Sequence, residues 1–163
     1  MIIDIFRSKM KDKHKIAHMK SAFNYAECST AKRLKVGCVI VKDNRIISIG
    51  YNGMPTGWTN ECEELILWEN NIQLSQPVLK TKPEVLHAEA NAITKLARSS
   101  ESGENAVAFI THQPCLECSK LLYQTGISEV YYVHEYRVKE GVEFLTKCKI
   151  KLHRMKDEYF IKL

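Results

Sequence analysis

Ala106-Val107-Ala108-Phe109-Ile110-Thr111 is an apolar run that is followed by Pro114-Cys115-Leu116-Glu117-Cys118 and then by Val130-Tyr131-Tyr132-Val133. Both apolar runs are short and rich in β-branched or aromatic residues, which is typical of buried strands. Between them, Pro114 is suited to the first position of a helix that runs from Cys115 to about Gln124 and ends near Gly126. Strand, helix and strand in this order predict a βαβ unit with parallel strands.

The alternation continues on both sides of this unit. Downstream, the sequence predicts a helix over 138–147 and a last strand over 149–153. Upstream, residues 88–98 are all acceptable helix formers, and 99–103 end that helix. A further amphipathic helix is predicted over 13–29, because apolar residues recur there at steps of three and four. Cys28 is expected at its end as a small buried residue.

Two β-branched runs, 36–41 and 45–50, are separated by the turn-forming residues 42–44 and predict an antiparallel hairpin. The next stretch, 50–57, holds three glycines and a proline. Such a loop can bring backbone amides close to a ligand, although an ordinary irregular connection uses the same residues. Residues 58–86 show no sustained period, so we interpret them as a long insertion with some helix that could act as a lid.

These elements predict an α/β fold in which a mixed sheet carries helices on its faces. With 163 residues, of which 45% are hydrophobic, the chain is long enough for one domain with a sizeable core. We therefore expect a single domain over 1–163, in which 1–12 form an arm or a loose end and 58–86 form the insertion.

The net charge of +5 fits an anionic small molecule, weak contact with nucleic acid, or an ordinary basic surface. The apolar run at 1–6 is too short for a signal peptide, and no stretch approaches the roughly 20 apolar residues of a membrane span. We expect a reducing, cytoplasmic setting and no membrane partner. In such a setting a Cys-x-x-Cys pair more often binds a metal or is redox-active than forms a structural bridge.

One imidazole, two thiolates and one carboxylate stand out as a chemical set. Cys115 and Cys118 are three residues apart at a helix start, where the helix dipole favours thiolates. His87 also begins a helix, and Glu89 lies within that helix's first turn. If the two helix starts converge, His87, Cys115 and Cys118 can hold a zinc ion with an open fourth position, as in catalytic zinc sites.

Each part of this set is ambiguous when taken alone, because a lone Cys-x-x-Cys is often structural or redox-active. A structural zinc site needs four ligands, and the other four cysteines form no second close pair. Thioredoxin-like chemistry does not need a His-x-Glu upstream. The combination fits the H-x-E…P-C-x-x-C signature of zinc-dependent nucleobase deaminases, in which the glutamate shuttles protons.

Four motifs together resemble the deoxycytidylate (dCMP) deaminase family, within the wider zinc-dependent cytidine deaminase superfamily. The resemblance covers about residues 17–137, and GYNGMPTG is the motif that separates this branch from the others. It implies a three-layer α/β/α cytidine deaminase-like fold with a mixed sheet of about five strands. It also implies conversion of dCMP to dUMP and ammonia, a step toward thymidylate. The motifs are Lys35 to Val41 (KVGCVIV), Gly50 to Gly57 (GYNGMPTG), His87 to Ile93 (HAEANAI) and Pro114 to Lys120 (PCLECSK).

The resemblance also implies roles for single residues. Zinc held by His87, Cys115 and Cys118 would lower the pKa of a water molecule. Glu89 would pass that water's proton to N3 of cytosine, so that hydroxide can add at C4, and would then protonate the departing amine. Asn52 would contact the sugar, while Arg98 and Tyr136 would lie near the 5′-phosphate. Arg98 could instead be a cation placed favourably at a helix C-terminus, and Tyr136 a half-buried packing residue.

Many family members are hexamers that dCTP activates and dTTP inhibits, with Mg²⁺ accompanying the triphosphate. The resemblance therefore implies a homohexamer and an effector site at Lys35, Gly50, Tyr51, Asn52, Gly53, Met54, Pro55 and Gly57. Some relatives bind a second, structural zinc, for which Cys28 and Cys62 are candidates, although both are more simply read as buried thiols.

Three alternatives stay open: deamination of another cytosine nucleotide, deamination of a base in single-stranded nucleic acid, and a zinc module without catalysis. The modest charge and the GYNG loop speak against a nucleic-acid partner. Glu89 speaks against a module without catalysis, because a structural zinc has no use for a free carboxylate beside it.

Overall fold

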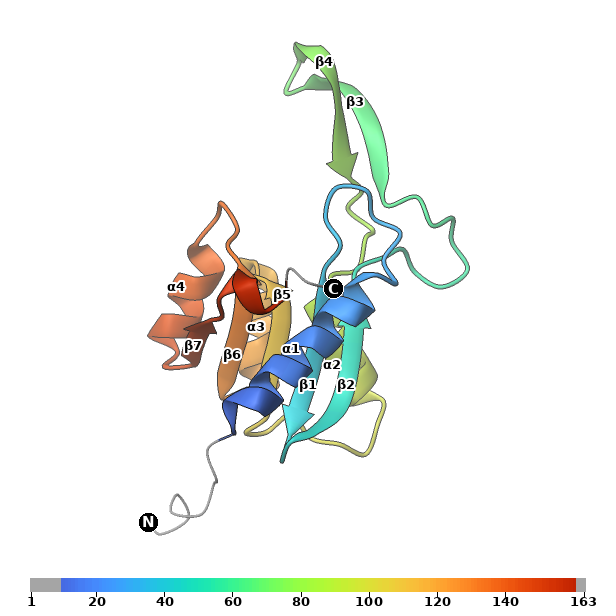
Figure 1. Cartoon of the computed structure of the whole chain (residues 1–163). Helices are drawn as coiled ribbons and strands as arrows, with labels where there is room; N and C mark the ends of the chain where they lie inside the picture. Colours follow the sequence, from blue (N-terminus) through green and yellow to red (C-terminus); the bar gives the residue numbers. More distant parts are fainter. Residues whose placement is uncertain (1–9, 161–163) are drawn as a thin grey trace.

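The computed structural model describes residues 10–160. Most of the predicted N-terminal arm over 1–12 lies outside them. Five strands form one sheet in the order β2-β1-β5-β6-β7 (Figure 1). β1 runs antiparallel to β2 and β5, whereas β5, β6 and β7 are parallel, so the predicted mixed sheet is confirmed. The strands are β1 (Gly37–Lys42), β2 (Arg45–Tyr51), β5 (Val107–His112), β6 (Glu129–His134) and β7 (Lys151–Arg154).

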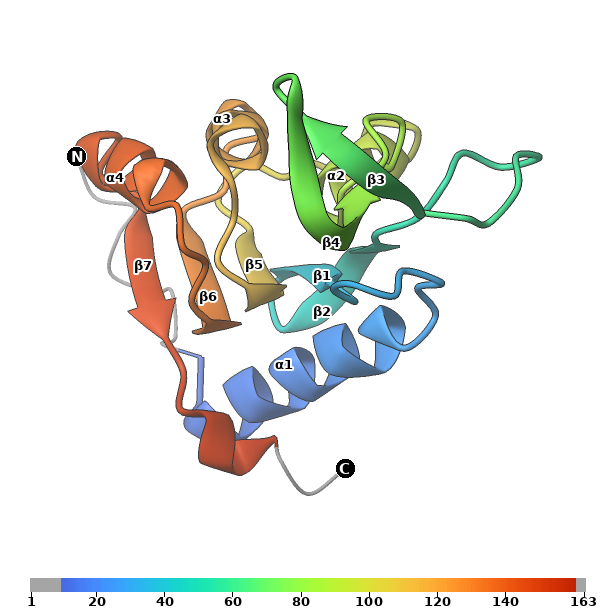
Figure 2. The ribbon, with the colours of Figure 1, turned by 90° about the horizontal axis from the view of Figure 1, so that it is seen from above.

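Helices cover both faces of the sheet and make three layers, as the family resemblance implied. Figure 2 shows α1 (Asp12–Ala26) on one face. The other face carries α2 (Ala88–Ala97), α3 (Leu116–Gln124) and α4 (Glu140–Lys147). The core divides in the same way: Val39 and Phe109 pack with residues of α1, whereas Ile40 and Ile110 pack with residues of the three-helix layer.

The predicted helices and strands of this layered body agree with the structure to within three residues, with two local errors. The helix predicted from Cys115 begins only at Leu116, because Cys115 has an extended backbone (φ −72°, ψ 170°) and is the N-cap. Pro114 therefore precedes the cap and is not the first helical residue. The predicted burial of Cys28 is wrong, because α1 ends at Ala26 and Cys28 is exposed in the turn that follows.

The insertion over 58–86 is a β-hairpin, so the prediction of helix there is wrong. β3 (Glu63–Glu69) and β4 (Ile72–Thr81) pair antiparallel through Asn70 and Asn71, whose φ values of 51° and 64° suit a tight hairpin turn. The hairpin forms its own two-stranded sheet and projects from the body of the molecule (Figure 1). Five large apolar side chains on it are exposed: Leu65, Leu67, Trp68, Ile72 and Val78.

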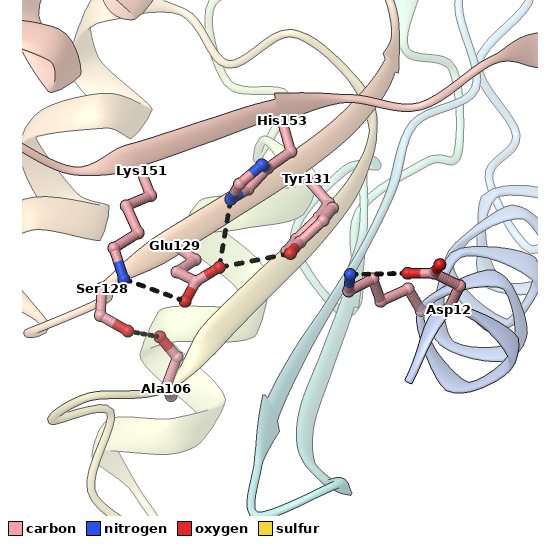
Figure 3. Close-up of polar contacts among 8 residues, drawn as sticks. Asp12, Ala106, Ser128, Glu129, Tyr131, Lys151 and His153 are labelled. Atoms are coloured by element: carbon pink, nitrogen blue, oxygen red, sulfur yellow. Dashed lines mark hydrogen bonds and ion pairs between the residues drawn. The ribbon is translucent and has the colours of Figure 1, made fainter. Parts of the chain in front are cut away.

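A polar cluster lies where β6 and β7 begin. The Glu129 carboxylate accepts a hydrogen bond from the Tyr131 hydroxyl at 3.2 Å and lies 3.1 Å from His153 Nε2 and 3.6 Å from Lys151 Nζ (Figure 3). The Tyr131 and His153 rings stack with their centroids 4.3 Å apart. Burial, with the nearby Glu129, raises the pKa of Tyr131 to about 12. These contacts tie β7 to β6 at the edge of the sheet.

The helices of residues 10–160 do not have the character of membrane spans. None of them is both long enough and apolar enough to cross a bilayer.

Candidate functional site

A cavity of about 510 Å³ opens where β5 and β6 end. Crevices at the carboxyl ends of parallel strands are the usual ligand sites of α/β sheets, and this volume is typical of small-molecule pockets. His87, Glu89 and Cys115 line the cavity, and Asn52 comes from the segment after β2. The cavity thus brings together residues from three separate stretches of the sequence.

The predicted zinc ligands converge at two helix starts. His87 is the N-cap of α2 and Cys115 that of α3, while Cys118 lies in the first turn of α3. His87 Nδ1 lies 3.6 Å from Cys115 Sγ and 3.4 Å from Cys118 Sγ. Donors that share a tetrahedral zinc with ordinary bond lengths lie about 3.6 Å apart, so these side chains fit that ion.

The thiols and the imidazole influence one another's protonation. A hydrogen bond with Cys118, aided by His87, lowers the pKa of Cys115 to about 4 against the opposing effect of burial. The same bond, together with burial, raises the pKa of Cys118. A hydrogen bond with Cys115 raises the pKa of His87. The pair therefore offers a thiolate at Cys115, which is the form in which cysteine binds metal.

Glu89 lies in the first turn of α2 and is 4% exposed. Burial is the main cause that raises the pKa of its carboxyl group. A buried carboxyl group at the wall of a cavity, two residues from His87, is positioned to exchange protons with a molecule bound there.

Asn52 lines the cavity and also organises its wall. Its Oδ1 accepts a hydrogen bond from the Val36 N–H at 2.8 Å, and its Nδ2 donates to the Leu34 carbonyl oxygen at 2.8 Å. Both ends of the amide therefore hold the segment before β1. The predicted sugar contact would use the hydrogen-bonding capacity that these two bonds leave over.

The two residues predicted near a phosphate have different surroundings. Tyr136 lines the cavity and is 40% exposed, so its side chain can be reached by a molecule bound there. Arg98 is the C-cap of α2, at the end of the helix opposite His87, and does not line the cavity. Its position matches the alternative role, a cation at a helix C-terminus.

The cavity is lined by two arginines that the sequence did not single out. Arg137 directly follows Tyr136, and no carboxylate among residues 10–160 pairs with it. Arg33 comes from the segment between α1 and β1 and donates to the Thr81 hydroxyl at 2.9 Å. Arg137 could have been found from its place just after β6, whereas Arg33 lies in a stretch without any motif.

Two histidines also line the cavity, at the ends of β5 and β6. The ring centroids of His112 and His134 lie 4.7 Å apart. Burial, together with His134, lowers the pKa of His112 to about 4, so its imidazole is neutral near pH 7. His112 Nδ1 lies 2.9 Å from the hydroxyl oxygen of Thr111, which accepts the Gly37 N–H.

Residues of the predicted effector loop make contacts that hold the loop against the rest of the fold. Asn91 donates to the Tyr51 carbonyl oxygen at 2.8 Å, and Lys95 Nζ lies 5.5 Å from the centre of the Tyr51 ring. Gly53 pairs with Leu86 in an antiparallel bridge. The contacts of Tyr51 fix the start of the loop against α2. Lys35, the predicted effector residue outside this loop, forms an exposed ion pair with Glu27 at 3.0 Å. The effector site itself stays a prediction.

Among residues 10–160, His87, Cys115 and Cys118 are the one group of three or more side chains arranged to share a metal. Cys62 is buried, with its sulfur 3.5 Å from the Thr30 hydroxyl, whereas Cys28 is exposed. The candidates for a second zinc therefore do not form a metal-binding group in the part of the chain that the structure describes.

Comparison with protein families gives an independent result. The family model described as the cytidine and deoxycytidylate deaminase zinc-binding region matches residues 12–134. A deoxycytidylate deaminase from Saccharomyces cerevisiae is 40% identical over 122 residues, which are 75% of this chain and 38% of the yeast protein. The human deoxycytidylate deaminase is 35% identical over 119 residues, 72% of this chain and 62% of that protein. The chain thus spans less than two thirds of either relative.

A solved structure matches over more of its length. The dCMP deaminase of cyanophage S-TIM5, crystallised in complex with dCMP and dUMP, is 40% identical and superposes with a TM-score of 0.79. The match covers 90% of this chain and 100% of the phage chain. The three-layer fold described above is therefore also that of the phage enzyme.

Proposed function

The chain belongs to the family defined by the cytidine and deoxycytidylate deaminase zinc-binding region, and on this basis we propose that it hydrolyses dCMP to dUMP and ammonia. The observation that carries the proposal is the buried Glu89 at the wall of a cavity that His87 and Cys115 also line, with Cys118 completing their group of metal donors. A zinc module without catalysis would not need that carboxyl group. The likeness to a phage enzyme bound to dCMP and dUMP supports the choice of nucleotide.

The residues of the cavity can divide the chemistry among themselves. His87, Cys115 and Cys118 would hold zinc, which when bound supplies a Lewis acid that lowers the pKa of a water molecule toward neutrality. Glu89 would accept a proton that this water gives up and donate it to N3 of the cytosine ring as the oxygen of the water bonds to C4. It would then transfer the remaining hydroxyl proton to the amine, which leaves as ammonia when the C4–N bond breaks. Burial keeps bulk water away from the carboxyl group during these transfers.

The cations of the cavity fit the phosphate of a nucleotide. A guanidinium binds a phosphate through two parallel hydrogen bonds, and the cavity is lined by Arg33 and Arg137. Tyr136, which also lines the cavity, carries a phenolic hydroxyl group, and Asn52 would contact the sugar. The phosphate role that the family resemblance implied for Arg98 is better filled by these two arginines, because Arg98 lies outside the cavity.

Assembly and regulation are part of the same proposal. The exposed apolar side chains of the β3–β4 hairpin support a homo-oligomer, for which the family suggests a hexamer. Activation by dCTP with Mg²⁺ and inhibition by dTTP would act through Lys35 and residues 50–57. A hyperbolic dCMP saturation curve that neither triphosphate changes would rule out this regulation.

The proposed location is the cytoplasm, where dUMP would supply thymidylate synthesis. Cys115 and Cys118 support this location, because both must stay reduced to bind a metal and a reducing compartment keeps them so.

A substrate panel tests the proposed function. The purified zinc-loaded protein is given dCMP, deoxycytidine, dCTP and a short cytosine-containing single strand, and released ammonia is measured with and without dCTP and Mg²⁺. We expect turnover of dCMP above all others. Turnover of the single strand alone would show that the substrate is a base in nucleic acid and not dCMP. Turnover of dCTP alone would show that the substrate is a different cytosine nucleotide.

The Glu89→Gln variant is the control for the mechanism in this panel. It should bind zinc and fold like the wild type but lose at least about 10²-fold in turnover, because an amide cannot shuttle a proton. The matched variant Glu117→Gln changes an exposed glutamate in the first turn of α3 and should keep full activity. Unchanged activity in Glu89→Gln would contradict the assigned mechanism.

A further inference from the structure

The β3–β4 hairpin is joined to the cavity wall through the two residues at its base. Glu63 opens β3 and Thr81 closes β4, and the two are register partners. The Glu63 carboxylate accepts hydrogen bonds from the backbone N–H groups of Lys32 and Arg33, each at 3.1 Å. Opposite it, the Thr81 hydroxyl accepts a hydrogen bond from Arg33 Nη1 at 2.9 Å. The hairpin base therefore holds one arginine by both its main chain and its side chain.

The segment that carries Arg33 is also held from its other end. Asn52 bonds the Leu34 carbonyl oxygen and the Val36 N–H, at 2.8 Å each. Between these bonds and those of Glu63, the backbone of 32–36 is fixed on both sides of Arg33. Arg33, Glu63 and Thr81 all line the cavity. The segment is thus a wall of the cavity whose position depends on the hairpin.

The charges are arranged so that Arg33 stays available to an anion. Both Glu63 oxygens face main-chain N–H groups, and no carboxylate among residues 10–160 forms an ion pair with the Arg33 guanidinium. Its one described side-chain partner is the neutral Thr81 hydroxyl. A long cation that is already held in one orientation loses less conformational freedom when an anion binds, which favours binding.

We infer that Glu63 and Thr81 are positioning residues, which hold Arg33 at the cavity for the anionic group of the bound molecule. The inference rests on the proposed function, because it takes that group to be the 5′-phosphate of a deoxynucleotide. It gives the insertion a task in substrate binding that differs from closing over the cavity as a lid. Glu63 and Thr81 act through Arg33 and need not touch the substrate.

The test compares Glu63→Ala with two matched variants. Glu63→Gln keeps an oxygen that can accept the same N–H groups, and Glu64→Ala removes an exposed neighbouring carboxylate that makes none of these bonds. The readouts are the dissociation constant of dUMP from titration calorimetry, kcat at saturating dCMP, zinc content and the melting temperature. Thr81→Val and Thr81→Ser probe the hydroxyl in the same way.

We expect Glu63→Ala to weaken dUMP binding about 10-fold, with kcat within about twofold of the wild type and zinc content unchanged. Glu63→Gln should recover most of the affinity, and Glu64→Ala should match the wild type. Thr81→Val should weaken binding by a smaller factor that Thr81→Ser restores. Unchanged dUMP affinity in Glu63→Ala, or a parallel fall in zinc content and melting temperature, would overturn the inference.

These results are separable from a failure of the proposed function. A wild-type chain that binds dUMP without deaminating dCMP would refute the function, and the affinities of the Glu63 variants would still decide the positioning role. A wild-type chain that does not bind dUMP at all would overturn both.

Discussion

Gly50 packs so closely against Ala88, the first residue of α2, that a side chain on Gly50 would collide with the Ala88 backbone oxygen. Its Cβ would also lie 2.5 Å from the backbone nitrogen of Ala92. The last part of β2 and the helix that carries Glu89 are therefore in backbone contact, which only glycine permits. The first glycine of the GYNG motif thus has a structural role next to the candidate metal ligands, whatever the motif binds.

Replacing Gly50 with alanine should push α2 away from β2. We expect a loss of about 1–3 kcal/mol in the free energy of unfolding, because the added methyl group meets backbone that cannot move aside. Zinc affinity should fall in parallel, since His87 begins the displaced helix. Urea denaturation and zinc analysis measure both effects. Gly53→Ala is the control, because nothing lies within 4 Å of a Cβ there, and equal effects at both positions would contradict the close-packing argument.

The zinc site makes a separate prediction about stoichiometry. The wild type should hold about one zinc per chain, because the described residues offer a single group of suitable donors. Cys115→Ser should lose the ion on dialysis against a chelator, whereas Cys28→Ser, which alters an exposed thiol, should retain it. Metal analysis by mass spectrometry decides this. Two zinc ions per chain would show that a second site exists.

Much of the fold could be predicted because, in the layered body, the secondary structure that the local sequence favours is the one that the tertiary packing requires. The apolar runs at 106–111 and 130–133 are buried between helices, so their composition alone marks them as strands. The grouping of the three candidate metal ligands could be predicted for a similar reason. Cys115 and Cys118 are close in sequence, and His87 begins a helix of its own, so only the meeting of two helix starts had to be assumed.

The hairpin in the insertion could not be predicted, because neither of its faces is buried and its sequence therefore lacks the alternation of apolar and polar residues that marks a strand. Leu65, Leu67 and Trp68 are all exposed on a two-stranded sheet, so apolar and polar residues do not alternate along β3. The one local signal was the pair Asn70 and Asn71, since asparagine tolerates the positive φ of a tight turn.

Arg33 escaped prediction for a different reason. The bonds that place it at the cavity come from Glu63 and Thr81, which are 30 and 48 residues away along the chain. Such long-range bonds leave no pattern in the residues around Arg33.

Two arginine variants test which cation binds the phosphate of dCMP. Arg137→Ala should raise KM for dCMP about 10-fold with little change in kcat, because it removes a guanidinium from the cavity wall. Arg98→Ala should leave both constants within about twofold, because Arg98 caps the far end of α2. Steady-state kinetics on the two variants separates the alternatives. A larger effect from Arg98 would restore the role that the family resemblance gave it.

The lowered pKa of His112 predicts how the free energy of unfolding changes at acidic pH. Its pKa falls from an ordinary value of 6.5 to about 4 in the folded chain, mainly through burial and secondly through the facing His134. Between these two pH values the unfolded chain binds a proton that the folded chain does not. The contribution of His112 to the free energy of unfolding therefore decreases as the pH falls from 6.5 toward 4 and is unaffected above that window.

His112→Asn should flatten this acid decline, because the residue that titrates differently in the two states is gone. Asparagine is chosen because its side chain can still bond the Thr111 hydroxyl. Urea titrations at several pH values from about 7.5 to about 4.5 measure the slope. The His14→Asn variant, which replaces a histidine of α1 outside the cavity, is measured in parallel as a control for the loss of a histidine. If the slope of His112→Asn equalled that of the wild type, the decline would come from other groups, and His112 would not be a buried neutral imidazole.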